Sequence, residues 1–290
     1  MNPLPLIVTA YYDIGRGQWQ HFQRGSDRYF ERFERLCLMH NDIVVYTHPT
    51  LRERFEALQR RKPNLTVIYD DIFERHAGLL ERIRAVQQDP EFRAGIGPIE
   101  SAEYNSAEYV LINALKSEFC CQAIDSGRFP HEQVAWIDFG YLRKARQIAR
   151  SRRWESPWPD GIHFFSLRSL APPIDLLRTI QTNTVYIQGC HLVAHRREWP
   201  FVREGLMGAL ESLLARGWVD DDQTLLLMLA LQHPDRVTVH PVALERRLDW
   251  FVLFRRFNPA EARATVVDRL GLLAGLAAHQ WRRARRKLGS

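Results

Sequence analysis

The sequence predicts an α/β protein built around a mostly parallel sheet flanked by helices, and two observations support that class. Short apolar runs rich in β-branched and aromatic residues alternate with amphipathic segments along residues 6–69. Strands and helices that alternate in this way form parallel sheets, because each helix carries the chain back to the same end of the sheet. The 290 residues, 46% of them hydrophobic, provide enough apolar surface for one large domain.

Three strands and two helices are expected in this first stretch. The strands are apolar runs of high β-propensity, and each helix places apolar residues on one face and charged residues on the other. The expected strands are residues 6–12, 42–47 and 65–69, and the expected helices are residues 28–38 and 51–61.

Helical segments are expected to follow. Residues 72–83 are amphipathic, and Asp70 and Asp71 before them are best explained as a helix cap, although acids at a strand end also compete as a metal site. Residues 87–98 contain two prolines and two glycines and are predicted to form a loop. Residues 101–124 are the strongest predicted helix of the chain.

The second half of the chain is expected to contribute four more strands and two more helices. The strands are residues 134–137, 162–166, 184–194 and 237–240, and the helices are residues 199–215 and 224–231. Gly189 interrupts the third of these strands. A bulge or the close approach of a ligand is expected there, because glycine has no side chain.

The positive charge is concentrated at the C-terminal end. Of the net charge of +6, five charges come from Arg282, Arg283, Arg285, Arg286 and Lys287. The remaining chain is almost neutral, which disfavours a nucleic-acid-binding protein.

The protein is expected to be cytoplasmic, soluble or attached to the inner membrane only peripherally. The N-terminus lacks the basic segment of a signal peptide, and no window approaches the ~20 apolar residues that span a bilayer. The four cysteines form no CxxC pair, which favours a reducing compartment over disulfides or a zinc ribbon.

One carboxylate, Asp138, directly follows residues 134–137, which suit a strand buried on both faces. Ligands bind at the carboxyl edge of an open α/β sheet, because the crevice beyond that edge is accessible and its backbone is rigid. A carboxylate there would hold a divalent cation, and the cation would neutralise a diphosphate. The alternative is an Asp that only caps the following turn.

Two polar stretches are candidate contacts for phosphate or hydroxyl groups. Asn105, Tyr109, Asn113 and Lys116 recur at helical spacing on one face of the long predicted helix. This face is either solvated or a site wall, and asparagines are poor mid-helix residues. Arg16 lies between two glycines, where it would approach a phosphate closely or belong to a plain turn.

Three consecutive acids, Asp220, Asp221 and Asp222, precede the helix expected at residues 224–231. The exposed N–H groups of a helix start favour acids, so capping explains one or two of them. Three carboxylates so close together repel one another, so capping alone does not explain all three. Such an arrangement suits a carboxylate that accepts a proton or grips sugar hydroxyls.

In their order along the chain, four stretches resemble the HtrL/YibB-like family of bacterial proteins. The stretches are Thr9-Ala10-Tyr11-Tyr12-Asp13, Trp136-Ile137-Asp138-Phe139-Gly140, Gln188-Gly189, and Gly217-Trp218 followed by Asp221-Asp222-Gln223. The resemblance covers nearly the whole chain. It implies a fold like that of the GT-A glycosyltransferases, with a mixed, mostly parallel sheet, a Rossmann-like nucleotide-binding half, and a role in lipopolysaccharide or other surface-glycan synthesis.

The resemblance also implies roles for individual residues. Asp138 takes the place of the first acid of the DxD motif, which binds the metal and the donor diphosphate, and Gly140 stands where the second acid would be. His240 resembles the late His that completes the metal site, which implies Mn²⁺ or Mg²⁺ at Asp138 and His240. By itself, a His at a strand end is more often structural. Asp222 or Asp221 would be the catalytic carboxylate on the acceptor side.

Together with the polar stretches, these roles give an expected donor site and an expected acceptor site. The donor residues are Thr9, Ala10, Tyr11, Arg16, Asn113, Lys116, Asp138 and Gly140, and the acceptor residues are Gln188, Gly189, Trp218 and Gln223.

The expected function is transfer of a sugar from a nucleotide-sugar to a hydroxyl of a bacterial surface-glycan acceptor. Asp138 and Asp222 would then form opposite walls of one cleft. The alternative is a non-catalytic glycan- or membrane-interface-binding protein that kept the fold and lost the DxD chemistry. Gly140 motivates this alternative, as do Trp199, Trp218 and Trp250, which would stack on sugars.

The chain is expected to divide into a single domain at residues 1–263 and a basic C-terminal helix at residues 264–290. In that helix Val267, Leu270, Leu273 and Leu276 are followed by the basic end. The helix would lie on an anionic inner-leaflet surface, near a lipid-linked acceptor, or pack against the domain with a solvated basic end.

Overall fold

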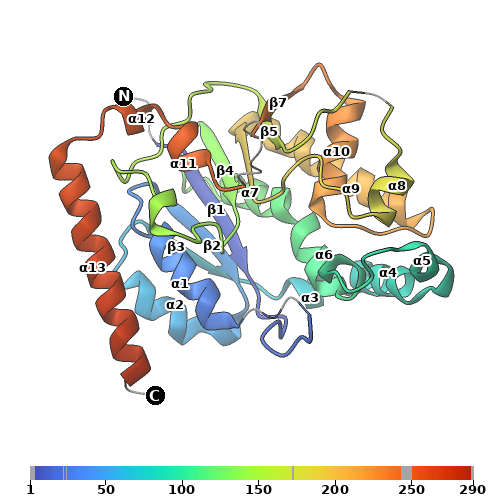
Figure 1. Ribbon diagram of the computed structural model, residues 1–290, viewed down its shortest axis with the longest axis horizontal. Helices are drawn as coiled ribbons and strands as arrows, with labels where there is room; N and C mark the ends of the chain where they lie inside the picture. Colours follow the sequence, from blue (N-terminus) through green and yellow to red (C-terminus); the bar gives the residue numbers. More distant parts are fainter. Residues whose placement is uncertain (1–3, 22, 24, 172, 243–249, 289–290) are drawn as a thin grey trace.

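A computed structural model describes residues 4–21, 23, 25–171, 173–242 and 250–288 and contains a seven-stranded sheet (Figure 1). The strands are β1 (Leu6–Tyr11), β2 (Ile43–Thr47), β3 (Leu65–Tyr69), β4 (Gln133–Ile137), β5 (Ile162–Ser166), β6 (His191–His195) and β7 (Val237–Pro241). They lie in the order β3-β2-β1-β4-β6-β5-β7.

The sheet is mixed but mostly parallel. β1 runs parallel to β2 and β4, β2 to β3, and β5 to β7, whereas β6 is antiparallel to both of its neighbours. Val8 of β1 lies opposite Trp136 of β4. The chain therefore leaves these two central strands at the same edge, side by side. The predicted α/β class is confirmed.

The predicted strands match the observed ones to within one or two residues, except at residues 184–194. There only His191–His195 joins the sheet as β6. Residues 184–190 follow β5 instead, through a single antiparallel bridge between Ser166 and Ile187, in which the Gln188 N–H donates to the Phe165 carbonyl and the Leu167 N–H donates to the Tyr186 carbonyl. One isolated bridge does not make a ladder, so this segment is not a strand.

The helices cover both faces of the sheet. The α-helices are α1 (Ser26–Leu36), α2 (Arg52–Gln59), α3 (Ile72–Arg75), α4 (Ala77–Gln88), α5 (Pro90–Gly95), α6 (Ala107–Ala114), α7 (Lys116–Asp125), α8 (Leu176–Gln181), α9 (Trp199–Leu214), α10 (Asp222–Gln232), α11 (Leu253–Arg256), α12 (Pro259–Ala262) and α13 (Val266–Leu288). Short 3₁₀ turns are η1 (Pro49–Leu51), η2 (Ala102–Tyr104), η3 (Ala145–Gln147) and η4 (Arg196–Glu198).

The prediction of one continuous helix over residues 101–124 is wrong. The segment is divided into η2, α6 and α7. Ser106 starts α6 as its cap, because its hydroxyl accepts the Tyr109 N–H at 3.1 Å. Asn105 therefore lies outside α6, and its amide donates to the Ser101 carbonyl at 3.0 Å. The chain bends again at Leu115, where ψ is 5°, and α7 begins at Lys116.

The prediction of a loop over residues 87–98 is also wrong in part. α5 forms within it, because Asp89 accepts the Glu91 N–H at 2.8 Å and Pro90 occupies the first helical turn.

The prediction of a helix cap after β3 is confirmed. Asp71 accepts the N–H groups of Phe73 and Glu74, both at 3.1 Å.

Alternate residues of the central strands enter two apolar cores. Leu6, Val8 and Ala10 of β1 pack with α6, α7, α9 and α10 on one face. Ile7 and Tyr11 pack with α1 and α11 on the other face. Because both faces of β1 are covered, the strand is almost continuously apolar in sequence.

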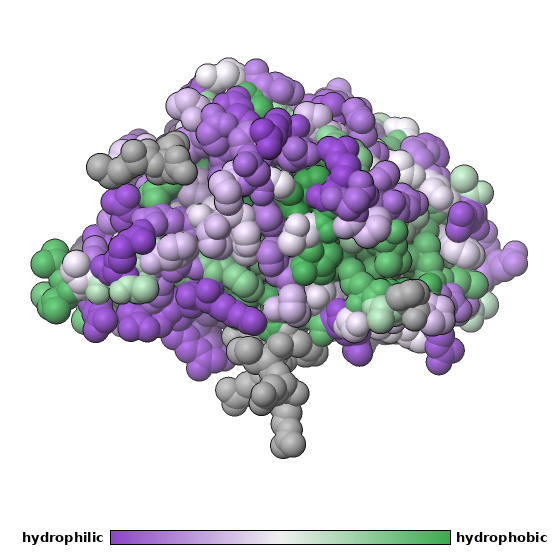
Figure 2. All heavy atoms as spheres, turned by 90° about the horizontal axis from the view of Figure 1, so that it is seen from above, coloured by the Kyte–Doolittle hydropathy of each residue, from purple (hydrophilic) through white to green (hydrophobic). Residues whose placement is uncertain are grey.

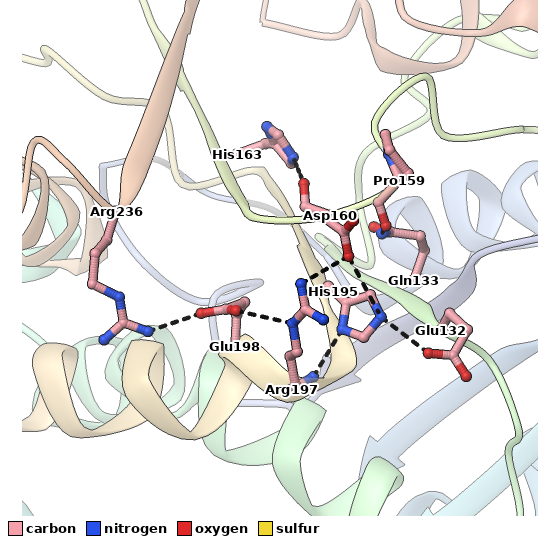
Figure 3. Close-up of polar contacts among 9 residues, drawn as sticks. All are labelled: Glu132, Gln133, Pro159, Asp160, His163, His195, Arg197, Glu198 and Arg236. Carbon is pink, nitrogen blue, oxygen red and sulfur yellow. Dashed lines mark hydrogen bonds and ion pairs between the residues drawn. The ribbon is translucent and has the colours of Figure 1, made fainter.

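A network of ion pairs lies at the amino end of β4, the end opposite to Asp138 (Figure 3). His195 lies 3.0 Å from a Glu132 carboxylate oxygen, and Arg197 donates to Asp160 at 2.9 Å. Glu198 extends the network to Arg236 at 2.8 Å. Surface pairs of this kind contribute at most about 1 kcal/mol each, so the network supports the scaffold modestly.

The C-terminal helix α13 packs along α1. Buried His279 lies 3.1 Å from the carboxylate of Glu34 on α1. Gly271 and Gly275 allow α13 to approach Arg152 and Leu38 closely, because a Cβ would lie 2.8 Å from Arg152 at the first position and 3.1 Å from Leu38 at the second. In the part of the chain that the structure describes, α13 included, no helix combines the length and apolar character needed to cross a membrane.

Candidate active site

A cavity of about 400 Å³ opens where the chain leaves β1 and β4. This volume lies within the usual range for small-ligand sites. The cavity is lined by the end of β1, α1, α6, α7, the end of β4, the Gly189 turn, the start of α10, and the segment before α11. The lining residues are Ala10, Tyr11, Tyr12, Asp13, Ile14, Arg16, Tyr29, Arg32, Tyr109, Ile112, Asn113, Lys116, Trp136, Asp138, Phe139, Gly140, Tyr141, Arg143, Gly189, Cys190, Asp222, Gln223, Trp250 and Phe251.

Asp138 is fixed at the edge of the cavity by backbone and side-chain hydrogen bonds. Its N–H donates to the Cys190 carbonyl at 3.0 Å, and its carbonyl accepts the Tyr141 N–H at 2.9 Å. The Trp136 indole N–H donates to the Asp138 carboxylate at 2.9 Å. The side chain is 39% exposed, so the carboxylate is held in place and still accessible to a ligand.

The three consecutive acids have different roles. Asp221 caps α10 by accepting the Gln223 N–H at 3.0 Å. Asp220 accepts the Asp221 N–H at 2.9 Å and the Thr224 hydroxyl at 2.6 Å. Asp222 alone lines the cavity. Local hydrogen bonding therefore explains two of the acids, and the third belongs to the site.

Lys116 joins the two acidic segments. Its ammonium lies 2.7 Å from the Asp222 carboxylate and 3.2 Å from the Asp138 carboxylate, and donates to the Gly189 carbonyl at 2.9 Å. Only 3% of the Lys116 side chain and 2% of the Asp222 side chain are exposed. Asp138 and Asp222 thus share one buried cation. The two carboxylates lie closer together than the sequence predicts, because it places them on opposite walls of a cleft.

Gly189 makes room for this ion pair. A Cβ at Gly189 would lie 1.7 Å from an Asp222 carboxylate oxygen and 2.4 Å from its Cγ. The sequence predicts a bulge or the close approach of a ligand at Gly189. In the structure the group that lies close to Gly189 is the Asp222 side chain.

The acids near the start of α10 lie in an environment that disfavours charge. Burial raises the pKa of Asp220 to about 7 and raises the pKa of Asp221 well above its ordinary value, with neighbouring carboxylates adding to both shifts. Burial also raises the pKa of Asp222, although Lys116 opposes the shift. For Lys116 burial alone would lower the pKa, but Asp138 and Asp222 outweigh it and raise the net value. Lys116 is therefore a permanent cation here.

Most of the residues predicted for the site meet in this cavity, and five do not. Those that line it are Ala10, Tyr11, Arg16, Asn113, Lys116, Asp138, Gly140, Gly189, Asp222 and Gln223. Thr9 is buried within β1, and Gln188 is buried against His191. Trp218 packs on the core beyond the lining, and Asp221 is the helix cap described above.

His240 is the fifth residue that does not reach the cavity. It lines a separate, smaller hollow with Trp158 and Phe257. Its ring lies 3.0 Å from the ring of His163, which in turn contacts the Asp160 carbonyl at 2.7 Å (Figure 3). Burial lowers the pKa of His240 to about 4, so the ring is neutral at pH 7.

The side chains around Asp138 do not fit a divalent metal. One Asp138 oxygen already accepts the Trp136 indole N–H and faces Lys116, Gly140 supplies no second carboxylate, and His240 lies elsewhere. Among the described residues, no group of three or more His, Cys, Asp or Glu side chains is placed to hold a metal ion. A lysine ammonium lies between the two carboxylates instead.

Several cavity residues were not predicted from the sequence, above all Arg32 and Tyr29. Tyr29 and Arg32 are three residues apart on α1 and therefore point the same way. In the sequence, Tyr29 belongs only to the apolar face of the helix expected at residues 28–38. Of the three tryptophans considered for sugar stacking, Trp250 lines the cavity, whereas Trp199 is fully buried and Trp218 packs outside it.

Comparison with solved structures finds transferases among the similar chains. Mouse xyloside xylosyltransferase 1 matches with a TM-score of 0.39 and 11% identity, over 81% of this chain and 84% of the other. The glycosyltransferase GlyE of Streptococcus pneumoniae TIGR4 matches with a TM-score of 0.38 and 12% identity, over 84% of this chain and 46% of the other.

Comparison of sequences gives a closer relationship. Protein HtrL of Escherichia coli (strain K12) is 33% identical over 271 residues, which cover 89% of this chain and 94% of that protein. Residues 5–259 match the model of a family described as "Bacterial protein of unknown function (HtrL_YibB)". This match includes every residue that lines the cavity. The chain therefore belongs to the HtrL_YibB family.

Proposed function

We propose that the protein is a glycosyltransferase that moves a sugar from a nucleotide-sugar to a hydroxyl of a bacterial surface-glycan acceptor, of the lipopolysaccharide type or related to it. One observation carries the proposal: Asp138 after β4 and Asp222 at the start of α10, far apart in sequence, share the ammonium of Lys116 in one cavity. A cavity at the carboxyl edge of parallel strands is the usual position of a nucleotide site in α/β proteins.

The reaction needs a base and a neutralised leaving group. The acceptor oxygen forms a bond to the anomeric carbon while the bond from that carbon to the phosphate oxygen breaks, and the nucleoside diphosphate leaves with the electron pair. The hydroxyl proton passes to the Asp222 carboxylate, whose pKa is raised by burial against the opposing effect of Lys116. Lys116 holds Asp222 and Asp138 in fixed positions through the step.

The two ends of the cavity suit the two substrates. Tyr11 stacks on Phe139 at 4.7 Å between ring centroids, and this aromatic end of β1 suits a nucleobase. Gln223 and Gly189 lie beside Asp222, where an acceptor hydroxyl would approach the base.

Release of the nucleotide from a panel of UDP-, GDP- and CMP-sugars tests this proposal without a known acceptor, because transfer to water also frees the nucleotide. Asp222→Asn is expected to lower the rate by about 10²–10⁴-fold, the usual contribution of a positioned acid–base group. Asp138→Asn is also expected to lower the rate, because Asp138 shares the Lys116 ammonium that holds Asp222 in place. Asp70→Asn is the matched control, because Asp70 also follows a strand but pairs with Arg75 outside the cavity. Equal turnover by the wild type and Asp138→Ala would rule out the proposed site.

The outer face of α13 suits a membrane surface, and contact there would bring the enzyme to a lipid-linked acceptor. Val267, Leu270, Leu273 and Trp281 are 60–77% exposed on this helix. Apolar atoms protrude in Figure 2 at the left edge, where Figure 1 shows the start of α13. Arg283 and Arg285 follow on the last turns, so apolar and basic groups occur together, as anionic lipid surfaces require.

Sedimentation with lipid vesicles tests this contact. The protein is expected to bind vesicles rich in phosphatidylglycerol more strongly than neutral phosphatidylcholine vesicles, and Leu270→Ser/Leu273→Ser is expected to lower binding at least threefold by removing buried apolar area. Leu177→Ser is the control, since Leu177 is an exposed leucine on α8. Unchanged binding after truncation at His279 would exclude the basic end from the contact.

A further inference from the structure

A second hollow, of about 350 Å³, lies beside β7, the edge strand of the sheet. Its walls are formed by Trp158, His240, Arg256, Phe257 and Asn258, and exposed prolines complete its rim. Among the described residues no carboxylate lines this hollow and Arg256 is its one cation. Such a lining favours an uncharged ligand over a metal ion or a polyanion.

Aromatic rings form the apolar part of the hollow. The ring of Trp158 lies 4.4 Å from that of His240 and 5.4 Å from that of Phe257 between centroids. These three rings are partly exposed, whereas His163, which stacks on Trp158 at 4.7 Å, is buried. The amide of Asn258 donates to two backbone carbonyls, at 2.8 and 3.0 Å. The walls are therefore held in place without a ligand.

Two linked histidines present a hydrogen-bond acceptor to the hollow. His163 Nε2 lies 2.7 Å from the Asp160 carbonyl, which only accepts, so Nε2 carries the proton (Figure 3). Burial lowers the pKa of both His163 and His240, so both rings are neutral at pH 7. His163 Nδ1 then accepts from His240 Nε2 at 3.0 Å. His240 Nδ1 keeps its lone pair, and no described residue donates to it.

Two donors complement this acceptor. The exposed Arg256 guanidinium lies 5.2 Å from the Phe257 centroid and uses one nitrogen for the Val242 carbonyl, at 3.3 Å. In the part of the chain that the structure describes, its other N–H groups and the Trp158 indole N–H have no acceptor. The indole nitrogen is also not among the buried polar atoms that lack a partner, so it remains accessible.

We propose that this hollow binds a neutral sugar ring. A pyranose has an apolar C–H face, which packs on aromatic rings, and a rim of hydroxyls, each of which both donates and accepts. One hydroxyl donates to His240 Nδ1, while its neighbours accept from Arg256 and Trp158. Apolar walls with a few placed polar groups are the usual composition of a small-ligand site.

Buried rings separate the hollow from the active-site cavity. Tyr141, which lines that cavity, lies 5.4 Å from His191 between ring centroids. His191 lies 4.2 Å from Phe165, and Phe165 lies 5.5 Å from His240. A sugar in the hollow therefore does not contact the carboxylates of the cavity. The inference goes beyond the proposed function, because the hollow would hold a glycan residue other than the one that reacts, and this binding requires no nucleotide.

Saturation-transfer NMR tests this site, because the method detects weak binding. The probes are the methyl glycosides of glucose, galactose, mannose and N-acetylglucosamine. At least one of them is expected to bind in the absence of any nucleotide. Neither UDP nor sodium phosphate should displace it, because the nucleotide is proposed to occupy the other cavity and the hollow favours an uncharged ligand.

Variants then locate the site. Trp158→Leu is expected to raise the dissociation constant of the bound glycoside about fivefold or more, because it removes an aromatic wall. Arg256→Met and His240→Phe keep apolar contact but lose hydrogen bonds, and each should raise the constant about threefold or more. Because Arg256 is exposed, loss of folding is not expected for its variant. Arg178→Met is the matched control, since Arg178 is an exposed arginine of α8 that does not line the hollow.

The outcomes separate this inference from the proposed function. The sugar site is overturned if none of the glycosides binds, if phosphate displaces them, or if Trp158→Leu and Arg256→Met both bind like the wild type. Loss of binding in Trp250→Leu but not in Trp158→Leu would assign the sugar to the active-site cavity and also overturn it. None of these results affects the glycosyltransferase proposal. Conversely, a failure to release nucleotide from any nucleotide-sugar would reject that proposal and leave the sugar site standing.

Discussion

Lys116→Met is expected to lower the free energy of unfolding by about 3–5 kcal/mol, the usual effect of removing one partner from a buried ion pair. The change leaves the carboxylates of Asp222 and Asp138 without their shared cation, and Asp222 is almost fully buried. Urea denaturation followed by circular dichroism measures the loss. Lys144→Met, at an exposed lysine, is the control and should change stability by less than about 0.5 kcal/mol.

The loss should depend on pH in a defined direction. Without Lys116, the pKa of Asp222 rises further above its ordinary value of 3.8. Between that value and the higher folded pKa, the folded state holds a proton that the unfolded state has lost, so stability falls as pH rises. The variant should therefore be closest to the wild type near pH 5 and furthest from it near pH 8.

A second substitution separates the ion pair from simple loss of packing. Lys116→Met/Asp222→Asn removes the buried negative charge as well and should recover part of the stability, most strongly at pH 8. If the double variant is no more stable than Lys116→Met at any pH, electrostatics does not explain the role of Lys116.

Gly189→Ala is expected to be the most damaging single-methyl substitution at the site. The new Cβ would lie 1.7 Å from Asp222 Oδ2, and Asp222 cannot move away without leaving Lys116. Overpacking typically costs about 1–3 kcal/mol, and disruption of the buried pair adds to that cost. Thermal and urea denaturation should both show the loss, and nucleotide-sugar turnover should fall with it.

Gly208→Ala is a control that is expected to raise the stability of the protein instead of lowering it. Gly208 lies inside α9 with no atom within 4 Å of the position of a Cβ, so alanine should stabilise the helix by up to about 1 kcal/mol. Gly189→Ala/Asp222→Ala should recover stability because it removes the clash. A Gly189→Ala protein as stable as the wild type would mean that Asp222 does not occupy the position described here.

The strands were largely predictable because each is a short run of high β-propensity, and the central ones are covered on both faces. β1, β2, β3 and β4 follow the apolar pattern to within two residues. The reversed direction of β6 was not predictable, because a buried strand has the same apolar pattern in either direction. The break of the long predicted helix had one local signal, Ser106, a good N-terminal cap that also occurs within helices.

The acids of the site were partly predictable. From the sequence, helix capping was expected to explain one or two of Asp220, Asp221 and Asp222. In the structure, two of them cap the helix or accept local hydrogen bonds. The sequence does not distinguish which acid faces the cavity. The predicted role of His240 was wrong, because a position at the end of a strand does not indicate where the ring points. This ring turns toward His163.

The sequence by itself determined the α/β class, the position of Asp138 at the end of a buried strand, and the acidic start of α10. These features are local, since they depend on apolar periodicity and on the preferences of helix ends. Only the tertiary structure decided that Lys116 joins the two acidic segments and that Arg32 fills the place beside Gly140. Both contacts join residues more than twenty positions apart, and their charges meet only after burial of the apolar faces has brought β4, α1, α7 and α10 together.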